Sequence, residues 1–137
     1  MNNNQPHDLV SVIVPTCDRP DLLLQALDSI ALQKYRPIEI IVCDNGLVPV
    51  NQKDLKPYNL DYYYISPRVG ASKARNYGVE RSNGKFLAFL DDDDTWDKDF
   101  LYLMMKKINE NGLDCVYGSK YIKKNGVVTK YKSIKTS

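Results

Sequence analysis

The sequence predicts an α/β protein: a three-layer α/β/α domain with a mainly parallel sheet, followed by a C-terminal β-hairpin. Short β-branched or aromatic runs alternate with segments in which apolar residues recur at helical spacing, as in βαβ units. The 137 residues, 43% hydrophobic and 26% charged, suffice for one domain with a core. Asn125-Gly126, between two apolar pairs, is a hairpin-turn signal.

Each expected strand is a short apolar run bounded by turn residues. In chain order the expected strands are residues 9–14, 38–43, 60–65, 86–90 and 113–117. The first run is almost continuously β-branched, which is typical of a strand buried on both faces, and Pro15 is expected to end it.

The expected helices follow from apolar stripes and from their end signals. Pro20 opens a helix over residues 20–31, and a second helix is expected from about Gly70 to Arg81. A third is expected after Asp97, which can cap it, and should stop at Asn111-Gly112. One further helical turn is expected around Lys53.

The expected organisation is a loose tail at residues 1–8, a domain at 9–118, and a Lys-rich hairpin at 119–137. The hairpin holds six lysines and no acid, which indicates a solvated face or, alternatively, peripheral contact with anionic lipid. The net charge of +2 gives no argument for a nucleic-acid partner. Three dispersed cysteines and no apolar run near ~20 residues indicate a cytoplasmic protein, with contact to the inner face of the membrane left open.

Four consecutive aspartates, Asp91 to Asp94, follow the buried run 86–90. Two unit charges about 4 Å apart repel by roughly 1 kcal/mol in water and about 4 kcal/mol near a protein surface. A divalent cation such as Mg²⁺ or Mn²⁺ would remove that cost, because both prefer oxygen ligands. If the segment is extended, Asp91 and Asp93 point one way, and Asp92 and Asp94 the other.

Other polar residues follow the ends of the expected strands. Pro15-Thr16 follows the first strand and Asp44 the second, so parallel topology places both at the edge that carries the aspartate run. Asp44 could accept a hydrogen bond from a nucleobase or ribose, or could simply form a turn. Arg75 could reach a base, a phosphate or the aspartates, or could be a solvated arginine paired with an acid. Trp96 could stack on a sugar or anchor a helix by burial.

Four segments in this order carry a family resemblance. They are Val10-Ser11-Val12-Ile13-Val14-Pro15-Thr16, Ile40-Ile41-Val42-Cys43-Asp44-Asn45-Gly46, Gly70-Ala71-Ser72-Lys73-Ala74-Arg75-Asn76-Tyr77-Gly78 and Phe89-Leu90-Asp91-Asp92-Asp93-Asp94-Thr95-Trp96. From about residue 9 to residue 118 the chain resembles the nucleotide-binding half of family 2 glycosyltransferases, which have the GT-A fold.

The resemblance implies a nucleoside-diphosphate-sugar donor, with a UDP-sugar favoured, and Mn²⁺ or Mg²⁺ as cofactor. By it, Asp44 would bind the base, Pro15 and Thr16 would line the nucleoside pocket, and Arg75 would help to hold the nucleotide. The aspartate run resembles the family's D-x-D motif. Asp93 and Asp91 would hold the metal, Asp91 and Asp92 would also contact the nucleotide, and Asp92 would reach the ribose or the metal.

The implied activity is metal-dependent, inverting glycosyl transfer to a hydroxyl of a saccharide or lipid-linked acceptor, as in polysaccharide biosynthesis. Two departures matter. Cys17-Asp18 stands where many relatives have an aromatic residue and Asn, and no residue after Trp96 fits the expected carboxylate base, so that base is expected beyond Ser137. We therefore expect a truncated form, a short gene product or half of a split enzyme, which alone could be inactive and in which residues 119–137 would begin a missing acceptor-binding half. The alternative is a non-catalytic nucleotide-sugar binding module.

Overall fold

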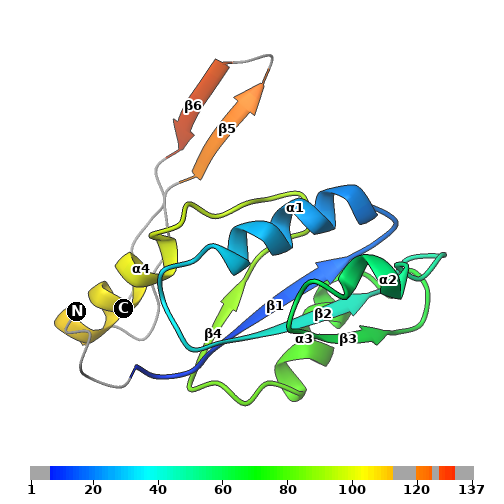
Figure 1. Ribbon diagram of the computed structural model, residues 1–137, viewed down its shortest axis with the longest axis horizontal. Coiled ribbons are helices and arrows are strands. Elements are labelled where there is room, and N and C mark those ends of the chain that lie inside the picture. The colour runs from blue at the N-terminus through cyan, green and yellow to red at the C-terminus, as the bar shows by residue number, and fades with distance from the viewer. Residues whose placement is uncertain (1–6, 113–119, 125–126, 132–137) are drawn as a thin grey trace.

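The computed structural model describes residues 7–112, 120–124 and 127–131 (Figure 1). The strands are β1 (Val10–Thr16), β2 (Ile38–Asp44), β3 (Asp61–Tyr64), β4 (Phe86–Phe89), β5 (Lys120–Lys124) and β6 (Val127–Tyr131). The helices are α1 (Pro20–Ala31), α2 (Gln52–Leu55), α3 (Ala71–Glu80) and α4 (Phe100–Asn111). Strands and helices alternate through β4 and α4, as the sequence predicted.

Four of these strands form a parallel sheet in the order β3-β2-β1-β4. Val10 at the start of β1 pairs with Ile38 on one side and with Phe86 on the other. A separate antiparallel pair joins β5 to β6. The predicted α/β class with a mainly parallel sheet is therefore confirmed.

The helices cover both faces of the sheet, giving three layers (Figure 1). On one face α1, α2 and α4 pack against the even-numbered residues of β1, and α3 packs on the other face against Ile13, Ile41 and Cys43. The larger core contains these buried residues: Val10, Val12, Val14, Leu23, Ala26, Leu27, Ile30, Tyr35, Ile40, Val42, Val50, Leu55, Leu90, Leu101 and Met105. The carboxyl ends of these strands carry the polar residues considered below.

Pro15 does not end β1, which was the expectation. The strand continues to Thr16, with Pro15 paired to Cys43 and Thr16 to Asp44. The Leu90 N–H donates to the Ile13 carbonyl, so Ile13 and, two residues on, Pro15 turn their backbone polar groups toward β4. Pairing with β4 stops at Ile13, so the N–H that proline lacks is not needed there.

The predicted cap of α4 is also wrong. The helix begins at Phe100, not directly after Asp97, and the preceding residue, Asp99, makes no capping hydrogen bond with its side chain. Gln33 takes that role from across the fold: its Oε1 accepts from the Leu101 N–H at 3.0 Å, and its Nε2 donates to the Asp97 carbonyl. The C-terminal end matches, because α4 stops at Asn111 and Gly112 is left-handed, with φ 60°.

Several expectations lie outside the described residues. These are most of the tail at residues 1–8, the fifth strand at 113–117, the turn Asn125-Gly126 and the lysine side chains of the C-terminal segment. Within the described ranges, no helix is both long enough and apolar enough to cross a bilayer.

Candidate functional site

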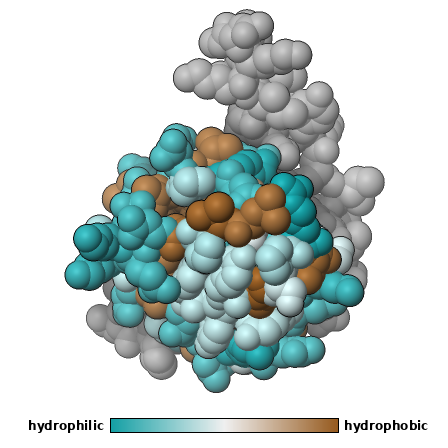
Figure 2. All heavy atoms as spheres, turned by 90° about the vertical axis from the view of Figure 1, so that its right-hand side faces the viewer, coloured by the Kyte–Doolittle hydropathy of each residue, from teal (hydrophilic) through white to brown (hydrophobic). Residues whose placement is uncertain are grey.

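The strand order reverses between β1 and β4, which is a topological switch point. From β1 the chain proceeds outward through β2 to β3, then returns to place β4 on the other side of β1. At such a switch point the loops after two neighbouring strands diverge, and ligands of open α/β sheets bind there, beyond the carboxyl ends of the strands. Figure 2 looks onto this side, where hydrophilic residues (teal) lie beside an apolar patch (brown).

The two loops at the switch point are joined through Asp92. Thr16 at the end of β1 donates from Oγ1 to Asp92 Oδ2 at 2.9 Å, and the Cys17 N–H approaches the same oxygen at 3.4 Å. The Asp92 side chain is only 1% exposed. Thr16 and Asp92, each predicted to bind the nucleotide, are therefore brought together, but as a buried link between the segments after β1 and β4.

Arg19 neutralises this buried carboxylate. Its Nε donates to Asp92 Oδ2 at 3.2 Å, and its Nη2 lies 2.5 Å from Asp92 Oδ1 as an ion pair. The remaining nitrogen, Nη1, donates to Asp93 Oδ2 at 3.3 Å. Partial burial acts to lower the pKa of Arg19, but the carboxylates of Asp92 and Asp93 outweigh it and raise that pKa, so the guanidinium stays charged.

The other three aspartates of the run form a separate cluster. One carboxylate oxygen from each of Asp91, Asp93 and Asp94 lies within 4.8 Å of the others. The expected alternation is wrong for Asp94, because the Asp94 N–H donates to the Asp91 carbonyl and turns the segment out of an extended path. Arg75 on α3 pairs with this cluster through a contact of 2.7 Å from its Nη2 to Asp91 Oδ1.

The cluster fits a hard divalent cation. Three carboxylates supply oxygen donors only, and Mg²⁺ and Mn²⁺ select oxygen ligands. Asp91 and Asp94 are half-buried and Asp93 is exposed, so the oxygens remain open to solvent on one side. The predicted metal residues Asp91 and Asp93 are thus adjacent, and Asp94 joins them.

Asp44 lies at the same rim but is buried. Its Oδ1 accepts from the Gly46 N–H at 2.9 Å, and its Oδ2 accepts from the Val50 N–H at 3.0 Å and the Tyr62 hydroxyl at 2.5 Å. Burial and the Asp44 contact raise the pKa of Tyr62, so this phenol remains a neutral donor. Asp44 is 0% exposed, so the predicted contact with a base stays a prediction that requires one of these donors to yield its place.

The loops after β1 and β2 are fastened together by Asp18. Its carboxylate accepts from the backbone N–H groups of Leu47 and Val48, which lowers the pKa of Asp18. A Cβ at Gly46 would lie 2.6 Å from Asp18 Oδ1, so only glycine fits there without a shift. Asp18, one of the two residues expected to depart from the family pattern, therefore joins the loops after β1 and β2.

Trp96 is held by contacts with α1 and α4. Its ring stacks on Phe100, with centroids 5.0 Å apart and planes 20° apart, and the backbone N–H of Trp96 donates to Ser29 Oγ. The half-buried ring also packs against the larger core. The burial interpretation is therefore the one that the contacts favour.

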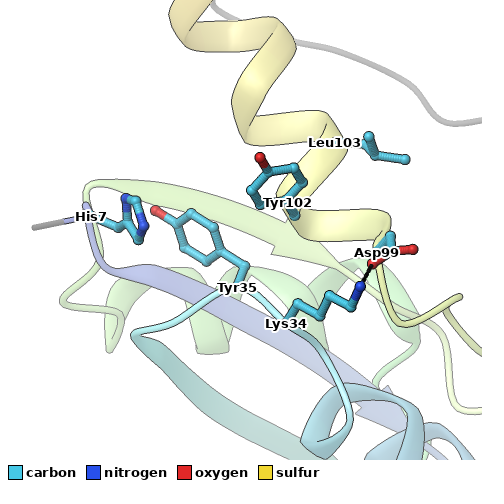
Figure 3. Close-up of a pocket in the computed structure, with 6 residues that line it drawn as sticks. All are labelled: His7, Lys34, Tyr35, Asp99, Tyr102 and Leu103. Carbon is cyan, nitrogen blue, oxygen red and sulfur yellow. Dashed lines mark ion pairs between the residues drawn. The ribbon is translucent and has the colours of Figure 1, made fainter. Parts of the chain in front are cut away.

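A pocket of about 450 Å³ lies elsewhere on the molecule (Figure 3). Its lining residues are His7, Lys34, Tyr35, Asp99, Tyr102 and Leu103. His7 precedes β1 and Tyr35 precedes β2, so both lie at the amino ends of these strands, at the opposite edge of the sheet from Asp91 to Asp94. The His7 and Tyr35 rings stack with centroids 5.4 Å apart.

Two residues of the rim were missed by sequence reasoning. In the local sequence Arg19 is simply the residue before Pro20, which opens a helix. Nothing nearby in the sequence indicates its contact with Asp92, 73 positions later. Asp94 was assigned to the opposite side from Asp91 because the run was treated as extended. A turn after β4 was the signal that could have corrected it.

Comparison with known proteins now assigns the family. A sequence model of glycosyl transferase family 2 matches residues 11–136. The chain therefore belongs to glycosyl transferase family 2, and its fold is that of the GT-A glycosyltransferases.

Individual relatives agree with this assignment. Glycosyltransferase GlyA of Streptococcus pneumoniae serotype 4 is 33% identical over 118 residues, covering 83% of this chain and 17% of GlyA. The GalNAc(5)-diNAcBac-PP-undecaprenol beta-1,3-glucosyltransferase of Campylobacter jejuni is 37% identical over 131 residues, covering 88% of this chain and 41% of that enzyme. The crystal structure of S. aureus TarS 1-349 in complex with UDP has a TM-score of 0.70 and 28% identity, covering 77% of this chain and 33% of that one. The chain thus spans less than half of each of these relatives.

Proposed function

We propose that this chain binds a nucleoside-diphosphate sugar at the switch point and serves sugar transfer to a hydroxyl acceptor. The observation that carries the proposal is the cluster of Asp91, Asp93 and Asp94 oxygens within 4.8 Å of one another, beside the residues after β1. The UDP complex of the TarS relative supports a uridine nucleotide as the donor. The proposed cation is Mn²⁺ or Mg²⁺.

In this proposal each part of the rim has a distinct task. Asp91, Asp93 and Asp94 would hold the cation, which would neutralise charge on the departing diphosphate. Asp92, fixed by Thr16, sets the spacing between the β1 loop and the cluster. Pro15 and Thr16 border the nucleoside, and Asp44 meets the base when Tyr62 or Val50 gives up its hydrogen bond.

Arg75 completes the anionic part of the site. Its guanidinium already neutralises Asp91 and is about one-third exposed, so it can also face a phosphate oxygen without leaving the rim. Arginine suits this position because its planar fork can contact two oxygens at once. Arg75 would thereby orient the diphosphate toward the cluster of Asp91, Asp93 and Asp94.

Transfer itself requires an acceptor and a general base. We assign inverting chemistry, in which a carboxylate outside residues 7–112 deprotonates the acceptor hydroxyl in line with the leaving diphosphate. The name of the C. jejuni relative, which includes PP-undecaprenol, supports a lipid-linked saccharide as acceptor. Such an acceptor would place the protein in the cytoplasm beside the membrane.

Calorimetric titration with UDP and Mn²⁺ tests the donor site. We expect saturable binding of UDP in the presence of Mn²⁺, weakened when the cation is removed by a chelator. A matched titration with GDP measures base preference. If folded protein binds neither nucleotide at millimolar concentration, the proposed donor site is wrong.

A non-catalytic nucleotide-sugar binding module is the second candidate. The observation in its favour is that the described aspartates of the rim already have other roles: Asp44 and Asp92 are buried, and Asp91, Asp93 and Asp94 form the proposed cation cluster. Both candidates require UDP binding, so binding does not separate them. Release of UDP from a UDP-sugar by this chain, with or without acceptor, would eliminate the non-catalytic candidate.

A further inference from the structure

We propose that Arg19 competes with the divalent cation for Asp93, while the same guanidinium keeps Asp92 out of the cation site. This inference rests on the proposed function only in taking the Asp91, Asp93 and Asp94 cluster as the cation site. It assigns to Arg19 a positioning role in deciding which of four adjacent carboxylates meets the cation.

The guanidinium contacts two neighbouring aspartates with different nitrogens. Nε and Nη2 face the two oxygens of Asp92, and Nη1 faces Asp93 Oδ2 at 3.3 Å. A planar fork of five N–H donors can make these contacts together, whereas a single ammonium group cannot. Pro20 supports the pose, because a residue before proline is kept out of the helical region and Arg19 has φ −134°.

The two contacts differ in how easily they break. The Asp92 side chain is 1% exposed, so removal of its partner would leave a buried charge unpaired. The Asp93 side chain is 48% exposed and the Arg19 side chain 47%, and ion pairs in water are weak. Nη1 can therefore leave Asp93 while the contact with Asp92 persists.

The Arg19 guanidinium and the divalent cation would both bind the Asp93 carboxylate. Its carboxylate belongs both to the Arg19 contact and to the three-oxygen cluster. A divalent ion bound by Asp93 would lie close to the Nη1 group and be repelled by its charge. Binding of the cation must therefore displace Nη1, and the charge on Arg19 lowers the affinity of the cluster for the free ion.

Titration with Mn²⁺ alone tests this competition, with free Mn²⁺ measured by electron paramagnetic resonance. We expect Arg19→Ala to bind Mn²⁺ about three- to tenfold tighter than the parent, because a competing and repelling charge is gone. Arg36→Ala is the control: Arg36 lies beyond the other end of α1, its guanidinium donates to the Ala31 carbonyl, and its loss should leave Mn²⁺ affinity unchanged.

The direction of the change is decisive. If Arg19 merely supports the loop, its removal would disorder the cluster and weaken Mn²⁺ binding. Unchanged or weaker affinity in folded Arg19→Ala therefore overturns the proposal. If that variant fails to fold, Arg19→Lys replaces it. A lysine can keep the ion pair with Asp92 but cannot also contact Asp93, so Mn²⁺ should again bind more tightly than to the parent. An affinity equal to that of the parent would overturn the proposal. No nucleotide is present, so failure of UDP binding would be a separate result.

Discussion

The Thr16 hydroxyl donates a hydrogen bond to the Asp92 carboxylate, 2.9 Å away and 76 residues later in the chain. The contact joins the carboxyl end of β1 to the segment after β4, at the point where the strand order reverses. It is buried, and the same Asp92 oxygen receives Arg19 Nε. A buried structural link thus joins the two segments that form the proposed donor site.

Replacement of Thr16 by Val should lower both stability and nucleotide affinity. Asp92 would lose one buried donor while keeping Arg19, so we expect a loss of about 1 kcal/mol in the free energy of unfolding. Urea unfolding measures this loss, and calorimetry measures the UDP affinity. The exposed Thr95→Val is the matched control, and equal stability of the two variants would contradict the prediction.

Replacement of Asp93 by Asn should weaken Mn²⁺-dependent UDP binding without unfolding the protein. We expect a loss of about tenfold or more, since even residues that only orient metal ligands typically contribute that much. Repulsion within the cluster falls, so the melting temperature without ligand should be equal or slightly higher. Melting curves with and without Mn²⁺ plus UDP give both results.

The control for that experiment is Asp97→Asn, an exposed aspartate outside the cluster. It should respond to Mn²⁺ and UDP as the parent does. Equal ligand-induced thermal shifts in Asp93→Asn and the parent would refute the assignment of Asp93 as a metal ligand.

Gly78 should not tolerate a methyl group. A Cβ there would lie 2.6 Å from Ile13 Cγ2 and 3.1 Å from Cys43 Sγ, beneath α3. Alanine favours a helix over glycine by about 1 kcal/mol, but overpacking costs about 1–3 kcal/mol, so we expect Gly78→Ala to be destabilising. Urea unfolding beside the exposed Glu80→Ala on the same helix measures the difference, and a stabilised Gly78→Ala would show that the core yields.

Glu39 should contribute to the loss of stability in acid. Burial acts to raise the pKa of Glu39, but hydrogen bonds from Ser11 and from the backbone and side chain of Asn83 outweigh it and lower that pKa below the ordinary 4.5. A depressed carboxyl pKa stabilises the fold above the unfolded value and loses that contribution as the pH falls through the folded value. Glu39→Gln should therefore lose less stability than the parent when the pH is lowered below 4.5.

The measurement is urea unfolding of both proteins at neutral and acidic pH. The difference between them isolates Glu39 from the other carboxylates, which titrate in both. A parallel decline of the two proteins with falling pH would mean that the hydrogen bonds to Glu39 do not favour its charged form.

Local signals predicted most of the fold. Pro20 and the apolar stripe set α1 at residues 20–31 as expected, and Asn111-Gly112 marked the end of α4. The expected cap failed because Gln33, distant in sequence, supplies the acceptor for Leu101. The expected end of β1 at Pro15 failed because the importance of a missing N–H depends on which neighbour it faces, and a single strand does not reveal its neighbours.

The site could be predicted in location but not in detail. Parallel topology alone brought Thr16, Asp44 and the aspartate run to one rim. The roles within the run depend on a turn after β4 and on Arg19, whose partners lie 73 and 74 residues away. The burial of Asp44 depends likewise on Tyr62 and Val50, which no strand-end pattern could indicate.

The strand order has a consequence for how the protein matures. β4 can pair with β1 only after β2 and β3 have been made, so a nascent chain that has emerged through residue 64 holds Thr16 and Asp44 but none of Asp91 to Asp94. A ligand that contacts both the segments after β1 and β2 and the segment after β4 can stabilise only the completed sheet. It cannot assist the early stages of folding. Donor nucleotide should therefore slow the unfolding of the completed domain while leaving the partial chain unprotected.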